Sequence, residues 1–192
     1  ILNYNKAIYY KYHKSAFKLG LYYYNKKNIT LAESFFLKGT NYNNAKCYLY
    51  LGLINIKLNN YYLIDKYFSK AIEYKNYEAY YHLGDYYAKF NNFSLAIKNY
   101  LKSIEILSDD KSMFKVGIYY LKIEKNIALA TQYLKLAAEK NNINALLCLN
   151  TPESYLKAIE LKCPIAMLRM AQYYSYNEEN KNNVKFFYII FK

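Results

Sequence analysis

The sequence predicts an all-α protein built from a repeated pair of antiparallel helices. Four of its glycines recur at fixed intervals, since Gly20, Gly52, Gly84 and Gly117 stand 32, 32 and 33 residues apart. Apolar residues between them recur every three or four positions, which is the spacing of one buried helix face. The 192 residues include only 5 glycines and 2 prolines, too few for the turns of a β sandwich. A fixed period of this length indicates a repeat architecture.

The first part of the chain fits this period from its beginning. Residues 1–14 are predicted to be the second helix of a preceding repeat, because Ala7 lies 13 residues before Gly20. The same spacing separates Gly39 from Gly52. Four complete copies are predicted to follow, at residues 15–44, 45–78, 79–111 and 112–144.

Within each complete copy, the glycine lies in a first helix and a second helix follows a short turn. Asparagine tolerates the left-handed backbone that such turns need. The turns are therefore expected at Asn59 and Asn60, at Asn91 and Asn92, and at Lys125 and Asn126.

The last two copies depart from the pattern. Residues 145–165 are predicted to form a degenerate copy, whose first helix is broken near Thr151 and Pro152. Residues 166–192 place Ala171 at the glycine position, followed by a charged loop and the short apolar segment 184–191. That segment stops where a second helix should continue, so the last copy is predicted to be truncated. Residues 1–192 are predicted to form a single repeat domain.

Small residues at two further positions explain why glycine recurs. Five residues before each glycine lies a small side chain, namely Ser15, Cys47, Ala79 or Ser112. A second small residue follows 19 or 20 residues after the glycine, with a large one three positions earlier, namely Phe36, Phe68, Tyr100 or Leu134. Glycine inside a helix costs about 1 kcal/mol relative to alanine, so a recurring glycine implies a compensating contact. We expect helices to approach closely there, with larger side chains of one helix filling the gap left by the other.

The composition narrows the classes of function. With 54% hydrophobic residues, the chain is too apolar to be disordered. No stretch approaches the ~18 apolar residues of a transmembrane helix. The 27 basic and 14 acidic residues give a net charge of +13, yet only Arg169 is an arginine. Because arginine is the better ligand for phosphates, its scarcity disfavours nucleic acid as a partner. Abundant Lys, Asn, Ile and Tyr are also typical of an AT-rich genome, so excess lysine alternatively means a solvated surface.

No catalytic constellation, cofactor motif or metal site is evident in the sequence. Cys47, Cys148 and Cys163 share no zinc or disulfide spacing, which favours free buried thiols in an intracellular reducing compartment. His82 and Asp85 lie one helical turn apart, but no nucleophile or oxyanion donor accompanies them. We therefore predict that the protein is not an enzyme and uses no cofactor.

At these positions the sequence resembles the Sel1-like and tetratricopeptide (TPR) repeat families. The third copy carries the resemblance most fully, with Ala79 and Gly84 followed by Ala96, Tyr100 and Ser103 at the spacing of a TPR hairpin. The 13-residue connectors between copies are shorter than those of a TPR and are similar to those of Sel1-like repeats. The turns within the hairpins are shorter than in most Sel1-like repeats, so the chain departs from both patterns.

The resemblance covers nearly the whole chain and implies a right-handed α-solenoid of antiparallel helix hairpins. In such a superhelix the first helices line a concave groove. The family's groove positions are six and three residues before the glycine, and one, four and five after it. Carried over to this sequence, the positions selected as the partner-binding groove are Lys14, Phe17, Tyr24, Lys46, Leu49, Lys57, Tyr81, Asp85, Lys89, Lys111, Phe114 and Lys122.

The resemblance implies a non-catalytic scaffold or adaptor that binds another protein. An apolar, aromatic groove with lysine rims suits a peptide or helix that has apolar anchors and acidic flanks. Two alternatives stay open at this point. The chain is instead a basic module that binds nucleic acid or another anionic surface, or the groove side chains partly pack between neighbouring helices.

Overall fold

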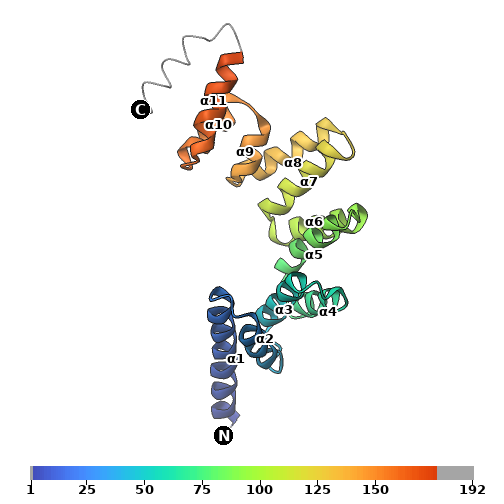
Figure 1. The fold of residues 1–192 in the computed structure, drawn as a ribbon, viewed down its shortest axis with the longest axis vertical. Helices are drawn as coiled ribbons and strands as arrows, with labels where there is room; N and C mark the ends of the chain where they lie inside the picture. The colour runs from blue at the N-terminus through green and yellow to red at the C-terminus, as the bar shows by residue number, and fades with distance from the viewer. Residues whose placement is uncertain (1, 177–192) are drawn as a thin grey trace. The chain divides into compact units, whose positions relative to one another are not determined.

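The computed structural model describes residues 2–176, and the side chains of residues 14–175. These residues form eleven α-helices that pack as successive hairpins, which confirms the all-α prediction (Figure 1). The chain divides into two compact units, Ile1–Leu107 and Ser108–Lys192. That residues 1–192 form one repeat domain stays a prediction. The predicted segment 184–191 lies outside the described residues.

Unit 1, residues 1–107, consists of three hairpins. In each hairpin the first helix packs against the second, and each second helix packs against the first helix of the next hairpin. The helices are α1 (Leu2–Asn25), α2 (Ile29–Thr40), α3 (Ala45–Lys57), α4 (Tyr61–Glu73), α5 (Glu78–Lys89) and α6 (Phe93–Leu107).

Unit 2, residues 108–192, contains one complete hairpin followed by shorter elements. Its helices are α7 (Asp110–Lys122), α8 (Ile127–Glu139), α9 (Ile143–Leu149), α10 (Pro152–Glu160) and α11 (Pro164–Tyr176). The predicted break near Thr151 is present. Asn150 has a left-handed backbone, and the Thr151 side chain caps α10 by accepting a hydrogen bond from the Ser154 backbone N–H at 3.2 Å. The clipped first helix of this copy is α9, which has 7 residues.

Helix α1 corrects one predicted boundary. The sequence predicts that residues 1–14 form a separate second helix, whereas α1 continues from Leu2 to Asn25 without interruption. The physical reason is that residues 6–19 contain no glycine, proline or asparagine that would end a helix. Because no described helix precedes α1, Ser15 is exposed, while its counterparts Cys47, Ala79 and Ser112 are fully buried.

The hairpin turns lie where the sequence predicts them. Asn59, Asn91 and Lys125 have φ values of 55°, 59° and 54°, in the left-handed region. Asparagine at this position costs little strain, because its short polar side chain tolerates the left-handed backbone. The side chain of Asn126 then caps α8 by accepting a hydrogen bond from the Leu129 backbone N–H at 3.1 Å.

Each recurring glycine faces a large side chain of its own hairpin. A Cβ atom built on Gly20 would lie 2.5 Å from the Phe36 ring, and one on Gly52 would lie 2.5 Å from the Phe68 ring. Gly84 faces the ring of Tyr100 in the same way. These distances leave no room for a methyl group, so the glycines let the two helices of each hairpin in unit 1 close on a ring, and Gly117 faces the Leu134 side chain in the same way. The predicted close contacts are thereby confirmed.

Candidate partner-binding surface

The first helices of unit 1 form a surface of their own. Consecutive first helices contact each other, α1 with α3 and α3 with α5, so side chains on the same register position lie next to one another. Nine of the twelve predicted groove residues belong to this unit. Lys111, Phe114 and Lys122 belong to α7 in unit 2 and are described separately below.

Three aromatic rings meet where α1 packs against α3. Tyr50 lies at the centre, because its ring centroid is 5.7 Å from that of Phe17 and 5.3 Å from that of Tyr24, both in edge-to-face geometry. Tyr50 also lies 5.1 Å from Phe36, the ring that fills the first glycine gap. Edge-to-face pairs of this kind stabilise by about 0.5–1.5 kcal/mol beyond the area they bury. The three rings therefore form a rigid aromatic platform that is joined to the core.

Two exposed lysines cover the platform. The Nζ atom of Lys57 lies 4.2 Å from the ring centroid of Tyr24, and that of Lys46 lies 5.8 Å from the ring centroid of Phe17. Both distances are within the ~6 Å range of a cation–π contact. The ammonium groups are thereby held beside the rings while they stay in contact with solvent. We call Phe17, Tyr24, Lys46, Tyr50 and Lys57 the platform cluster.

The Tyr50 hydroxyl adds no charge to the platform, because its pKa is raised. Burial raises the pKa of Tyr50, and the neighbouring Tyr24 and Glu78 raise it further. Its hydroxyl therefore stays protonated at neutral pH and is available as a hydrogen-bond donor. A platform with apolar faces, a hydroxyl donor and two cations favours a ligand that carries an apolar group next to a carboxylate.

Sequence reasoning missed Tyr50, although a signal was present. Tyr50 lies two residues before Gly52, and His82 occupies the same position before Gly84. The His82 ring stacks on Phe68 of the preceding hairpin, with 6.1 Å between centroids. The position two before the glycine therefore packs backward onto the previous copy. Two aromatic rings at that position in successive copies were the available signal.

Leu49 is a correction to the predicted surface. It is only 3% exposed and packs in a core cluster with Ile64, Phe68 and Leu83. Its counterpart Phe17, at the same distance from a glycine, stays half-buried. Residues of α4 and α5 pack around Leu49, although α2 and α3 contact α1 in the equivalent way. Leu49 is therefore a core residue rather than part of an exposed groove surface.

Asp85 has a structural partner inside the protein. Its carboxylate accepts a hydrogen bond from the Tyr100 hydroxyl, with 2.6 Å between the oxygens. Tyr100 is buried in the third hairpin, and burial together with the Asp85 carboxylate raises the pKa of Tyr100 well above its ordinary value. Asp85 is thus tied to the core through Tyr100, and its side chain is half-buried.

The other predicted residues of unit 1 lie around α5 or at the start of the described side chains. Tyr81 lies 6.1 Å from the Tyr100 ring and is half-buried. Lys89 is exposed, with its Nζ atom 5.9 Å from the ring centroid of Phe90. Lys14 is exposed on α1. That these three residues line one groove with the platform cluster stays a prediction.

In unit 2, Lys111 and Lys122 are exposed and Phe114 is half-buried. Burial raises the pKa of the Cys148 thiol, while the charges of Lys122 and Arg169 oppose this shift. Cys148 is exposed, which corrects the prediction that all three thiols are buried; only Cys47 and Cys163 are.

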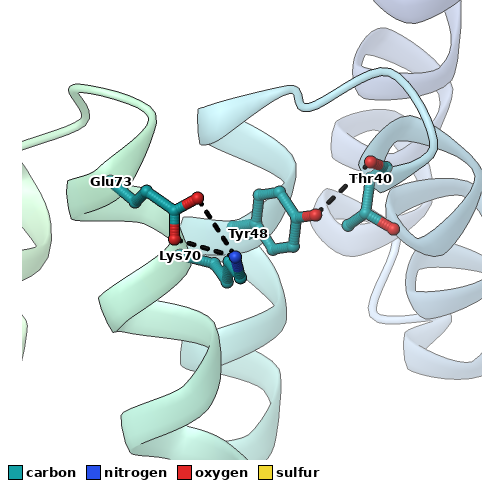
Figure 2. A network of polar contacts seen from close by, with 4 residues as sticks. All are labelled: Thr40, Tyr48, Lys70 and Glu73. Carbon is teal, nitrogen blue, oxygen red and sulfur yellow. Dashed lines mark hydrogen bonds and ion pairs between the residues drawn. The ribbon is translucent and has the colours of Figure 1, made fainter.

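On α4 of unit 1, a lysine forms an ion pair with a carboxylate (Figure 2). There the Lys70 Nζ atom forms an ion pair with Glu73 at 2.8 Å, and the nearby Tyr48 hydroxyl donates to the Thr40 carbonyl oxygen at 3.4 Å. The Tyr48 ring also stacks on Tyr74, 5.5 Å away. An exposed pair such as Lys70 and Glu73 contributes about 0–1 kcal/mol. Lys70 also lies 5.8 Å from the Tyr74 ring centroid, so it contacts both a carboxylate and a ring, whereas Lys46 and Lys57 of the platform cluster lie beside rings.

Neither metal ligation nor membrane crossing is indicated within residues 2–176. This part of the chain holds no group of three His, Cys, Asp or Glu side chains placed to bind a metal ion. It also has no helix with the length and apolar character that a bilayer span requires.

Comparisons with known proteins identify the fold. The sequence matches no protein-family model and no curated protein. The structure is similar to a Sel1 repeat protein from Oxalobacter formigenes, with a TM-score of 0.68, 18% identity, and coverage of 93% of this chain and 86% of that one. It is equally similar to PilF from Pseudomonas aeruginosa, with a TM-score of 0.68, 14% identity, and coverage of 93% and 90%.

A third structure is YrrB, described as a TPR protein with an unusual peptide-binding site. It has a TM-score of 0.55 and 16% identity, with coverage of 82% of this chain and 84% of that one. The structural neighbours are thus Sel1-repeat and TPR-repeat proteins, as the sequence resemblance predicts. This fold commonly serves as a protein-interaction scaffold and is typically non-catalytic.

Proposed function

We propose that the protein is a non-catalytic adaptor, and that the platform cluster on α1 and α3 binds an acidic segment of another protein. The observation that carries the proposal is the pairing of exposed lysines with an aromatic platform. Lys57 lies 4.2 Å from the Tyr24 ring centroid, and Tyr24 and Phe17 both pack against Tyr50. A peptide or helix with an apolar anchor would cover the rings, and its acidic flank would meet the ammonium groups.

Charge supports this choice of partner. Unit 1 contains 15 lysines and 6 acidic residues, so its field attracts a negatively charged segment. The similarity to YrrB supports peptide binding as a use of this fold, because the description of that protein names a peptide-binding site. Leu49 is excluded from the contact because it is buried.

A paired charge reversal tests the proposal. The double variant Lys46→Glu, Lys57→Glu should lose the partner proteins that the intact chain captures from a cell extract, by at least about tenfold, since each site changes from attraction to repulsion. The matched control is Lys38→Glu, Lys98→Glu, which makes the same charge change at exposed positions of the second helices. Quantitative mass spectrometry of the captured proteins provides the measurement.

The outcomes separate the adaptor from the nucleic-acid alternative. Equal loss with both double variants would mean that net charge alone matters, and would refute the platform cluster as the site. Nucleic-acid binding would instead appear as capture of oligonucleotides, with an affinity that falls steeply between about 50 and 200 mM salt. Capture that survives nuclease treatment and depends on Lys46 and Lys57 supports the adaptor.

A further inference from the structure

A second apolar surface lies at the turn edge of unit 1, where the α3–α4 and α5–α6 turns are found. Tyr61 at the start of α4 lies 5.2 Å from Phe90 and 6.4 Å from Tyr86, both at the end of α5. Tyr86 and Phe90 lie 5.3 Å apart. Leu58, at the end of α3, and Tyr62 adjoin these rings along the chain. We call Leu58, Tyr61, Tyr62, Tyr86 and Phe90 the turn patch.

Four of the five large side chains of the turn patch are exposed to solvent. Tyr62 is 87% exposed, Leu58 54%, Phe90 48% and Tyr61 46%. An isolated exposed apolar residue needs no explanation, but a contiguous group of large ones indicates an interaction site.

The preceding junction has aliphatic residues at the equivalent positions. Between the first and second hairpins, Ile29, Ile54 and Leu58 stand in place of Tyr61, Tyr86 and Phe90. Ile54 is fully buried in a core cluster and Ile29 packs against it, whereas Leu58 is 54% exposed. Two aliphatic residues therefore close the preceding junction, and Leu58 at its edge belongs to the turn patch.

The charges beside the turn patch are mainly positive. Lys57 precedes Leu58, and the Lys89 Nζ atom lies 5.9 Å from the Phe90 ring centroid. Lys66 follows Tyr62 by one helical turn on α4 and is exposed. The carboxylate in this region is Asp65, which accepts a hydrogen bond from the Tyr87 hydroxyl at 2.7 Å.

We propose that the turn patch docks on an anionic membrane surface, with Leu58, Tyr62 and Phe90 entering the lipid headgroup region. Tyrosine and phenylalanine with flanking lysines are the side chains that suit this interface, where rings bury partly and ammonium groups meet acidic lipids. Leu58 distinguishes a membrane from single-stranded nucleic acid, because an aliphatic side chain partitions into lipid but offers no ring for stacking on a base.

The chain contains no tryptophan, so a single introduced tryptophan can act as a fluorescent reporter. In the variant Tyr62→Trp, the emission of this single tryptophan should shift to shorter wavelength with vesicles of phosphatidylcholine and phosphatidylserine. It should not shift with vesicles of phosphatidylcholine alone. The matched variant Leu101→Trp places the reporter on α6, at a residue that is 38% exposed, and should show no shift with either vesicle.

Co-sedimentation with the same vesicles measures the contribution of the patch. The triple variant Leu58→Ser, Tyr62→Ser, Phe90→Ser should bind at least about tenfold more weakly than the unchanged chain, because the inserted apolar area is lost. The control Leu37→Ser, Leu101→Ser, Ile106→Ser removes three exposed apolar residues, 43%, 38% and 42% exposed, from the second helices and should bind normally. Binding of the unchanged chain should also weaken as salt is added.

Several results would overturn the proposal. Equal binding to both kinds of vesicle would exclude recognition of anionic lipid, and equal loss in both triple variants would exclude the turn patch. A shift of the tryptophan emission with an oligonucleotide or with an acidic peptide, but not with vesicles, would assign the patch to that partner instead. The single substitution Tyr62→Trp keeps the test valid if a triple variant fails to fold. The outcome is independent of the platform cluster, whose rings are unchanged in every variant.

Discussion

The second and third hairpins fill the same glycine gap with nearly the same ring, but they place different chemistry beside it. In the second hairpin Phe68 faces Gly52, and the residue after the glycine is the apolar Leu53. In the third hairpin Tyr100 faces Gly84, and the residue after the glycine is Asp85. One hydroxyl group at the ring position is therefore accompanied by one carboxylate within hydrogen-bond distance, at 2.6 Å.

The comparison teaches that a residue at a groove position need not serve a partner. By family resemblance Asp85 is a groove residue, yet its contact with buried Tyr100 gives it a structural role. A buried hydroxyl without a partner costs about 1–3 kcal/mol, which is enough to maintain an acidic residue at that position. Groove positions therefore have to be sorted by what each side chain already contacts.

The largest effect is expected from removal of the ring itself. Phe68→Ala should lower the free energy of unfolding by about 3–5 kcal/mol, because it deletes a fully buried ring and leaves a cavity against Gly52. Chemical denaturation followed by circular dichroism measures the change. Ser69→Ala, at an exposed neighbouring position of α4, is the control and should change little. A loss below about 1 kcal/mol for Phe68→Ala would contradict the packing seen here.

The next largest effect is expected when the polar pair of the third hairpin is replaced by the apolar pair of the second hairpin. Asp85→Leu should cost about 1–3 kcal/mol, because it leaves the Tyr100 hydroxyl without its acceptor. Tyr100→Phe, Asp85→Leu reproduces the pair found in the second hairpin and should recover most of that loss. The measurement is a double-mutant cycle on the free energy of unfolding. Additive single effects would show that the hydrogen bond contributes nothing.

A smaller difference is expected between two glycines. Gly52→Ala should destabilise by about 1–2 kcal/mol, since the new methyl group overlaps a rigid ring and the gain in helix propensity offsets only about 1 kcal/mol. Gly117→Ala should cost less, because its shortest distance, 2.9 Å to the Leu134 Cγ atom, is longer than the 2.5 Å to the Phe68 ring, although the Leu134 backbone nitrogen also lies 3.3 Å away. Thermal melting of the two variants compares them directly. A larger loss at Gly117 would reverse this reasoning.

The smallest expected effect is a loss of stability at alkaline pH, and it arises from the third hairpin but not from the second. Three residues after the glycine, the second hairpin has Asn55 and the third has Tyr87. Burial raises the pKa of Tyr87 to about 12, and its hydrogen bond to Asp65 adds to the shift. A raised pKa means that the folded state holds the proton more tightly, so stability is retained below pH ~10 and falls as pH rises toward 12.

The variant Tyr87→Phe tests this dependence. It should make the decline of unfolding free energy between pH ~10 and 12 less steep, and Asn55→Ala should leave the slope unchanged because neither residue titrates there. Denaturation series at several pH values give both slopes. Identical slopes for the unchanged chain and Tyr87→Phe would show that Tyr87 titrates as freely as in the unfolded chain.

Much of the fold follows from local patterns in the sequence. Gly52 and Phe68 are 16 residues apart, and the turn residue Asn59 lies between them. These features predict a hairpin because each acts within a few helical turns, where a small residue, a ring and a left-handed turn constrain one another. The predicted boundary at residue 14 is wrong for a related reason, since the periodic spacing of Ala7 suggests a helix end but no residue there interrupts α1.

The candidate site was less predictable, because it depends on neighbouring copies. Lys46, Lys57, Phe17 and Tyr24 were assigned from register alone, and the structure brings them together. The ring at their centre, Tyr50, comes from a position that the register does not mark.

The sequence by itself determined that helices pair into hairpins, where the turns lie and which large side chain faces each glycine, because those features depend on residues within one hairpin. Only the tertiary structure decided which side chains at equivalent positions are buried and which are exposed. Leu49 is buried in a cluster with residues of α4 and α5, whereas Phe17 stays half-buried at the same register position. The physical reason is that burial depends on how the surrounding side chains pack together, and the spacing of a repeat does not specify that packing.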